Sequence, residues 1–165
     1  MNLILRGMQP TDWAKVAEIY KQGIETGNAT FQQTIPTWDE WNIAHIGSCR
    51  MVAVVDDEIA GWVALSAVSN RPVYAGVAEV SVYVGSKHRG QKIGTKLLEA
   101  IIPESENNGF WTLQAGIFPE NIPSITVHMK AGFREIGYRE KVAKMKNVWR
   151  NTVLLERRSS VAGID

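Results

Sequence analysis

The sequence predicts a mixed α/β fold, in which a partly antiparallel sheet is flanked by helices. The chain has 165 residues, 45% of them hydrophobic, which is enough to build the core of one domain. Segments with apolar residues three or four positions apart interleave with segments in which every second residue is apolar, a pattern typical of alternating helices and strands. Two strand-like segments are joined by a short acidic turn at residues 56–57, so the sheet is not expected to be all parallel.

The individual elements follow from local patterns. In residues 11–25 the apolar side chains fall on one helical face, and Thr37 with Glu40 forms a capping box that starts a second helix. Pro103 is expected to kink or end the third helix, and Asn121 and Gly132 to start and stop the fourth. Strands are expected at residues 3–6, 50–55, 58–68, 78–84, 111–118, 134–140 and 149–158, and helices at 11–25, 37–46, 94–102 and within 119–133.

Composition argues against several classes of protein. The net charge of +1 argues against a general nucleic-acid-binding surface, and no apolar run is long enough to span a membrane. Residues 1–10 are too short an apolar stretch for a signal peptide. The single cysteine, Cys49, cannot form an internal disulfide, so a reducing cytoplasm is expected. The three histidines are far apart and lack metal-ligand spacing, so no metal site is expected.

Residues 88–96, HRGQKIGTK, join a strand-like segment to a helix-like one and hold two glycines among basic side chains. The start of a helix presents unpaired backbone N–H groups and the positive end of the helix dipole, so this junction predicts an anion-binding site. The segment lacks the ending of a Walker loop and the third glycine of a dinucleotide-binding fingerprint.

A second segment narrows the choice of anion. Residues 119–133, PENIPSITVHMKAGF, contain a spaced set formed by Asn121, Ser124, His128, Gly132 and Phe133. Together with residues 89–94, this set resembles the two acyl-CoA-binding segments of the GCN5-related N-acetyltransferase (GNAT) family. The likeness extends over nearly the whole chain, and it is to the branch that acetylates phosphinothricin, methionine sulfoximine and related amino-acid analogues.

The resemblance implies a mostly antiparallel sheet with one splayed parallel strand pair, and acetyl-CoA as the co-substrate. It implies that residues 82–84 bind the pantetheine arm and that the helix start binds the pyrophosphate. Lys92 stands where the family has a glycine, which adds a positive charge near the phosphates. The residues expected to contact acetyl-CoA are Val82, Tyr83, Val84, Arg89, Gly90, Gln91, Lys92, Ile93, Gly94, Thr95, Asn121 and Ser124.

Acetyl transfer to an amino acid needs a base, because its amine is mostly protonated near neutral pH. In residues 78–84, AEVSVYV, alternation places Glu79 on one strand face with Ser81 and Tyr83. The resemblance gives Glu79 the role of the base, and the alternative is an exposed glutamate in a salt bridge. His128 stands where relatives have a proton donor for the thiolate, and its alternative is a packing histidine. Asn121 serves equally well as a helix cap.

The acceptor site is expected to be lined by Phe31, Arg71, Glu79, Ser81 and Trp149. Arg71 matches an arginine of the branch and would bind a substrate carboxylate, and its alternative is a loop arginine in solvent. Phe31 would form an apolar wall. The branch usually has an aspartate at the position of Asn151 and often a lysine at that of Met145, so the identity of the acceptor stays open.

Three functions are compatible with the sequence. The first is acetyl transfer from acetyl-CoA to the amine of a small amino acid or toxic amino-acid analogue. The second is a non-catalytic acyl-CoA-binding module, and the third is acetylation of a peptide N-terminus or polyamine. Glu79 and His128 favour an enzyme, and the long loops at residues 27–36 and 69–76 favour a small substrate. The branch is commonly homodimeric, so a homodimer is expected.

Overall fold

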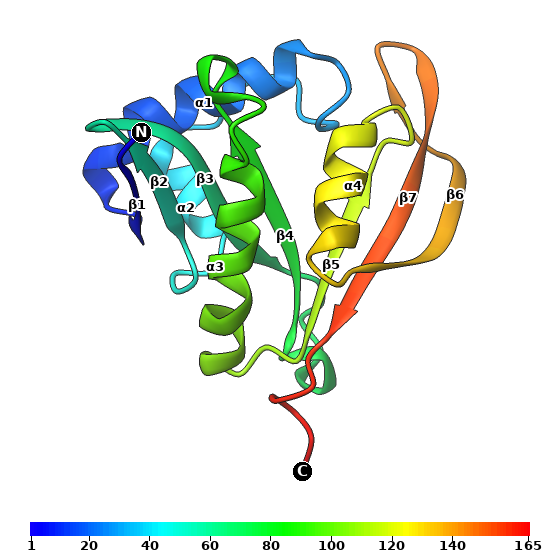
Figure 1. The fold of residues 1–165 in the computed structure, drawn as a ribbon. Coiled ribbons are helices and arrows are strands. Elements are labelled where there is room, and N and C mark those ends of the chain that lie inside the picture. The colour runs from blue at the N-terminus through cyan, green and yellow to red at the C-terminus, as the bar shows by residue number, and fades with distance from the viewer.

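The computed structural model describes all 165 residues, which form one seven-stranded sheet with helices on both faces (Figure 1). The strand order is β1-β2-β3-β4-β5-β7-β6, and only the β4–β5 pair is parallel. This confirms the expected mixed, mostly antiparallel sheet. The strands are β1 (Leu3–Gly7), β2 (Met51–Val55), β3 (Glu58–Ala67), β4 (Val77–Val84), β5 (Thr112–Ile117), β6 (Arg134–Met145) and β7 (Val148–Arg158). The helices are α1 (Trp13–Glu25), α2 (Trp38–Ala44), α3 (Ile93–Asn107) and α4 (Ile122–Lys130).

The two faces of the sheet bury separate apolar clusters. On one face, called the α1 face, Val16 of α1 and Trp41 of α2 pack around Trp62 of β3. On the other, called the α3 face, Leu97 of α3 packs with Val80 of β4, and residues of α4 border the same cluster. Because side chains alternate along a strand, consecutive residues of β4 serve opposite faces. None of the helices has the length and apolarity that crossing a membrane requires.

The parallel pair is short, and its strands then separate. Val77, Ala78 and Glu79 of β4 pair with residues 112–114 of β5, and no pairing between these strands extends beyond Glu79. Past that point β4 keeps its antiparallel partner β3, and β5 keeps β7. Figure 1 shows the two strands close at one end and splayed at the other. The structure therefore contains the splayed parallel pair expected from the sequence.

A glycine fixes the closed end of this pair. The Gly76 carbonyl accepts hydrogen bonds from the backbone N–H groups of Trp111 (2.8 Å) and Thr112 (3.1 Å). A Cβ atom at Gly76 would lie 2.1 Å from the Trp111 ring, although the backbone of Gly76 does not have a positive φ. Gly76 is therefore required for close packing, and it determines where β4 and β5 meet.

Two elements differ from the sequence-based expectation. The third helix does not end at Pro103 but continues to Asn107. Pro103 removes one backbone donor, and the carbonyl four residues earlier belongs to Glu99, which is exposed, so water can replace the lost bond. The strand expected at residues 134–140 extends to Met145, because Lys146 and Asn147 form a tight turn with φ of 48° and 64°.

We expect Gly76→Ala to destabilise the fold by about 2 kcal/mol, because an added methyl group would overlap the Trp111 ring. Thermal or denaturant unfolding measures this loss. Gly7→Ala is the matched control, since a Cβ atom at Gly7 would meet nothing within 4 Å. Equal stabilities of the two variants would contradict the role given to Gly76.

Candidate active site

The splayed end of the strand pair leaves backbone groups of β4 without a partner strand. The Gly85 N–H donates to the Ala60 carbonyl (2.8 Å), so the odd-numbered residues of β4 exchange hydrogen bonds with β3. The N–H and C=O groups of Val82 and Val84 therefore point toward β5, which β4 no longer pairs with. An extended chain with amide groups, such as the pantetheine arm, fits these groups as an added strand would.

The start of α3 lies beside this opening and is basic. A Cβ atom at Gly94 would lie 3.6 Å from the Val84 side chain, which places the first turn of α3 against the end of β4. Gly90 and Lys92 both have positive φ, 77° and 62°. Lys92 is exposed without an ion-pair partner, and so are Lys87 and Arg89. The unpaired N–H groups of the helix start and these cations fit a pyrophosphate.

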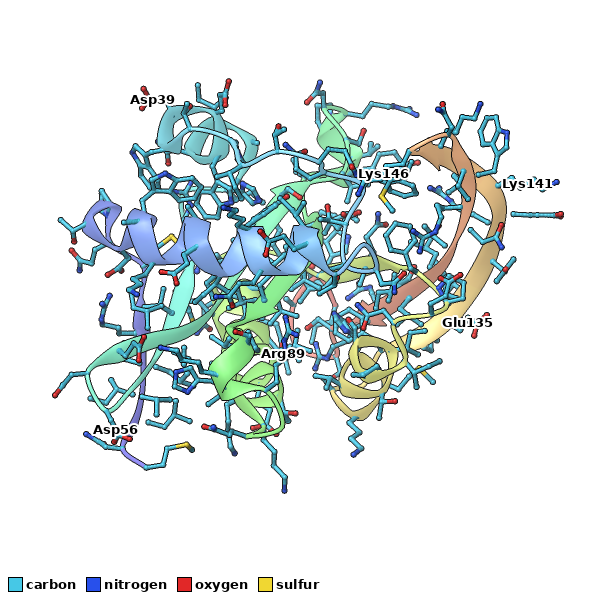
Figure 2. All side chains as sticks on the ribbon, turned by 90° about the horizontal axis from the view of Figure 1, so that it is seen from above. Asp39, Asp56, Arg89, Glu135, Lys141 and Lys146 are labelled. Atoms are coloured by element: carbon cyan, nitrogen blue, oxygen red, sulfur yellow. The ribbon has the colours of Figure 1, made fainter.

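The remaining residues of this segment hold its conformation. Ile93 is buried in the core, and Thr95 and Gly94 are partly buried in the first turn of α3. The Gln91 side chain donates to the Lys87 carbonyl (3.3 Å). Figure 2 labels Arg89 on the segment that leads into α3.

Glu79 lies on the opposite face of the sheet, the α1 face. It is partly exposed, and no basic side chain lies within salt-bridge distance, so the structure does not show the alternative of a salt-bridged glutamate. Ser81 lies two residues further on the same face, beside the opening. Tyr83 differs, since its ring stacks on Tyr20 (5.0 Å between centroids) and Trp62 (4.8 Å) and burial raises its pKa. Its ring therefore packs in the aromatic cluster of the α1 face.

Two polar residues that the sequence reasoning missed belong to this face. Gln114 of β5 is the register partner of Glu79, so their side chains are neighbours across the last pair. The Arg150 guanidinium donates to the Gly27 carbonyl (2.9 Å) and to the Asn28 side chain (2.8 Å), and thus ties the loop after α1 to β7. The alternation of side chains along residues 111–118 predicts the sheet face on which Gln114 lies. No local pattern in the sequence predicts the long-range hydrogen bonds of Arg150.

Phe31 packs against another aromatic ring to form an aromatic wall, and its contact with an acceptor stays a prediction. Its ring meets that of Phe118 edge-on at 4.8 Å, and the Arg150 guanidinium lies 4.0 Å from the centroid of Phe118. Phe118 directly follows β5, so this wall stands at the end of the strand that borders the opening.

The α4 residues have well-defined structural contacts. Asn121 accepts a hydrogen bond from the Ser124 N–H (3.4 Å) and so caps the helix. His128 is buried against Phe133, and its Nδ1 lies 2.7 Å from the Ser124 carbonyl. Burial lowers the pKa of His128, and its Nε2 has no partner. The packing alternative for His128 thus describes this structure, and its role as proton donor stays a prediction.

Two expected acceptor residues, Arg71 and Trp149, form no hydrogen bond or ion pair with Glu79. Arg71 is exposed in the loop before β4, with its guanidinium 5.7 Å from the Tyr74 ring centroid and no carboxylate partner. Trp149 is 55% exposed on the β6–β7 hairpin, where the Lys144 ammonium lies 5.5 Å from its ring centroid. Their contact with an acceptor therefore stays a prediction.

The two departures from the branch pattern have structural roles here. Met145 is buried at the end of β6. The Asn151 side chain accepts a hydrogen bond from the Lys141 N–H (2.7 Å) and stabilises the kinked part of the hairpin. Cys49 is buried, as expected for a thiol without a catalytic role.

Comparisons with known proteins agree with this geometry. The model of the acetyltransferase (GNAT) family matches residues 13–133. The chain is 32% identical to YwnH of Bacillus subtilis, named as a candidate phosphinothricin acetyltransferase, over 87% of this chain and 91% of the relative. It is 24% identical to an L-methionine sulfoximine/L-methionine sulfone acetyltransferase of Pseudomonas paraeruginosa, over 94% of each chain. The crystal structure of a phosphinothricin acetyltransferase from Sinorhizobium meliloti in complex with acetyl-CoA superposes with a TM-score of 0.89 at 26% identity, covering 100% of this chain and 92% of that one.

The buried His128 predicts a pH dependence of stability. Its pKa is lowered by folding, so below about pH 6.5 the unfolded chain binds a proton that the folded chain does not, and stability falls as the pH falls. Between pH 7.5 and 5.5, wild type should lose more unfolding free energy than His128→Asn, by at most about 1.4 kcal/mol per pH unit below pH 6.5. Asparagine keeps an N–H donor for the Ser124 carbonyl. The pKa of His45 is also lowered by burial, but His45 is present in both proteins, so its effect cancels in the comparison. Denaturant unfolding at several pH values measures the difference, and identical pH profiles would contradict it.

Proposed function

This chain belongs to the acetyltransferase (GNAT) family and is an acyltransferase, and we propose that it transfers the acetyl group of acetyl-CoA to the amine of a small amino acid or toxic amino-acid analogue of the phosphinothricin or methionine sulfoximine type. One observation carries the proposal. The opening between β4 and β5 has unpaired backbone groups and a basic helix start on one side, and a carboxylate, Glu79, on the other. Two substrates that approach from opposite faces of the sheet would meet there.

Acetyl-CoA, when bound, supplies an activated acetyl thioester. In this proposal the backbone of Val82 and Val84 orients the pantetheine arm, and a free N–H of this strand polarises the thioester carbonyl. The N–H groups between Gly90 and Thr95, with Lys92 and Arg89, bind the pyrophosphate. Asn121 and Ser124 border the same face from α4. The positive φ of Gly90 supports this assignment, because it lets the backbone curve around an anion.

Glu79 accepts the proton of the acceptor amine, directly or through one water. The carboxylate is free of ion pairs and lies where β4 and β5 separate, so it is available to the amine. Gln114 beside it offers an amide that can hold the amine or the water. The neutral His128 has a free Nε2 lone pair, so donation from Nε2 to the leaving thiolate would require prior protonation.

The relatives matched by sequence support an amino-acid acceptor rather than a peptide or polyamine, although one similar structure, of 25% identity, is named a ribosomal-protein-alanine N-acetyltransferase. Phosphinothricin and methionine sulfoximine acetyltransferases match over most of this chain. Phe31 and Phe118, held by Arg150, close one end of the site and leave room for a compact substrate. Arg71 would bind the carboxylate of the acceptor, and its guanidinium has no competing acidic partner.

The catalytic prediction combines an amine panel with Glu79→Gln. We expect wild type to release CoA with phosphinothricin or methionine sulfone, and the variant to turn over about 10²- to 10⁴-fold more slowly, because glutamine keeps the shape but loses the basicity. Acetyl-CoA affinity, measured by calorimetry, should not change. Glu58→Gln is the control, since Glu58 is also a partly exposed strand glutamate and lies in another part of the sheet. Near wild-type turnover of Glu79→Gln would remove Glu79 as the base, and inactivity of wild type on the whole panel would overturn the proposed acceptor.

The loop prediction concerns Lys92, whose φ of 62° is unfavourable for a residue with a Cβ atom. We expect Lys92→Gly to stabilise the fold by about 1 kcal/mol, because it removes the left-handed strain. The same variant should bind CoA more weakly and with a smaller salt dependence, because it removes a cation near the phosphates. Lys146→Gly is the control, since Lys146 also has a positive φ (48°) and Figure 2 shows it on the β6–β7 side, away from Arg89. Equal CoA affinity and salt dependence in both variants would contradict a phosphate contact for Lys92.

We further propose a cytoplasmic homodimer. The edge strand β6 is long and exposes Ile136, Tyr138 and Val142, and an exposed apolar edge is a common site of association. Light scattering at micromolar concentration should give the mass of two chains. A monomer over a wide concentration range would overturn this proposal.

A further inference from the structure

Gly116 of β5 is a glycine that the fold itself does not require. Its φ is not in the positive range, and a Cβ atom at this position would meet nothing within 4 Å. By contrast, a Cβ atom would collide with neighbours at Gly61 and Gly76. A glycine inside a strand weakens it, and one with no conformational or packing cause often marks the close approach of a ligand.

The position of Gly116 identifies the space that it leaves open. Leu113, Ala115 and Ile117 of β5 are buried in the α3-face core, so Gln114 and Gly116 face the α1 side. Gln114 is the register partner of Glu79 in the last β4–β5 pair. Gly116 lies two residues beyond, about 7 Å along the strand, where β4 has already separated. It is exposed although its strand lies inside the sheet.

The surroundings of Gly116 are mostly apolar. Leu154 of β7 is its register partner. Phe118 follows two positions later, and the Phe31 ring packs against the Phe118 ring. The Arg150 guanidinium lies 4.0 Å from the centroid of the Phe118 ring. It donates hydrogen bonds to the Gly27 carbonyl and the Asn28 side chain in the loop after α1. Gly116 is therefore a gap in a row of side chains, with Gln114 on one side and Phe118 on the other.

We propose that Gly116 determines the specificity for the acceptor: the space above it receives the side chain of the amino acid whose amine is held at Glu79. This rests on the proposed function and deepens it. The favoured acceptors are amino acids with a side chain of several atoms, because the space borders the aromatic wall and starts one side-chain position from the base. Acceptors with a short side chain do not fill it.

The test uses Gly116→Ala and Gly116→Val in the full chain. The measurement is kcat and KM for CoA release with alanine, norvaline, methionine sulfone and phosphinothricin. A few added carbon atoms in an apolar pocket typically change selectivity 10- to 200-fold. We expect Gly116→Val to lower kcat/KM for the longest acceptors at least 10-fold relative to kcat/KM for the shortest acceptor that the enzyme turns over. Most of this change should be a rise in KM. Gly116→Ala should have an effect between those of wild type and Gly116→Val. Acetyl-CoA affinity should equal that of wild type, because the backbone groups proposed to bind the cofactor are unchanged. The melting temperature should equal that of wild type or be higher, because a glycine inside a strand is replaced.

Gly7→Val is the matched control. Gly7 is also a strand glycine whose Cβ atom would meet nothing within 4 Å, but it lies on the edge strand β1, four strands from β5. It should keep the wild-type order of acceptors. A uniform loss with all acceptors, unchanged selectivity in Gly116→Val, or the same loss of selectivity in Gly7→Val would overturn the role of Gly116. A wild type inactive with every acceptor would instead overturn the proposed function and this inference with it.

Discussion

The structure depends on the shortness of one parallel strand pair. Two hydrogen bonds to the Gly76 carbonyl start the pairing of β4 and β5, and the pairing stops at Glu79. Beyond this point each strand keeps a single antiparallel partner, so backbone donors and acceptors inside a sheet remain free. Unpaired backbone groups are costly in an interior, which makes the opening a natural site for a ligand that can act as a strand.

Local patterns in the sequence were enough to predict most elements and the face on which Glu79 lies. The acidic turn at residues 56–57 forms the expected hairpin, since Asp56 and Asp57 have φ of 47° and 68°. Thr37 and Glu40 form the expected capping box. These features depend on residues within a few positions of each other, and short-range rules describe them well.

The parts that could not be predicted depend on contacts between distant residues. Pro103 was expected to kink or end a helix, and α3 does not end there but runs on to Asn107. Gln114 is the neighbour of Glu79 only because of the register of the parallel pair, and Arg150 reaches a loop more than 120 positions away in sequence. The resemblance to a family correctly predicted the splayed strands. It could not show that Tyr83 packs into the aromatic cluster or that the Trp149 ring packs against Lys144.

The register of β4 determines both which side chains face the α1 side and which backbone groups point toward the opening. Alternation gives the α1 face Glu79 and Ser81, and it turns the backbone of Val82 toward the opening. A slip of one residue would move Glu79 to the α3 face and turn the Val82 amide toward β3, so both proposed roles would be lost together. Two contacts oppose such a slip: the Tyr83 ring stacks against both Tyr20 and Trp62, and Gly76 fits only against Trp111. The aromatic cluster of the α1 face thus holds the register on which the proposed site depends.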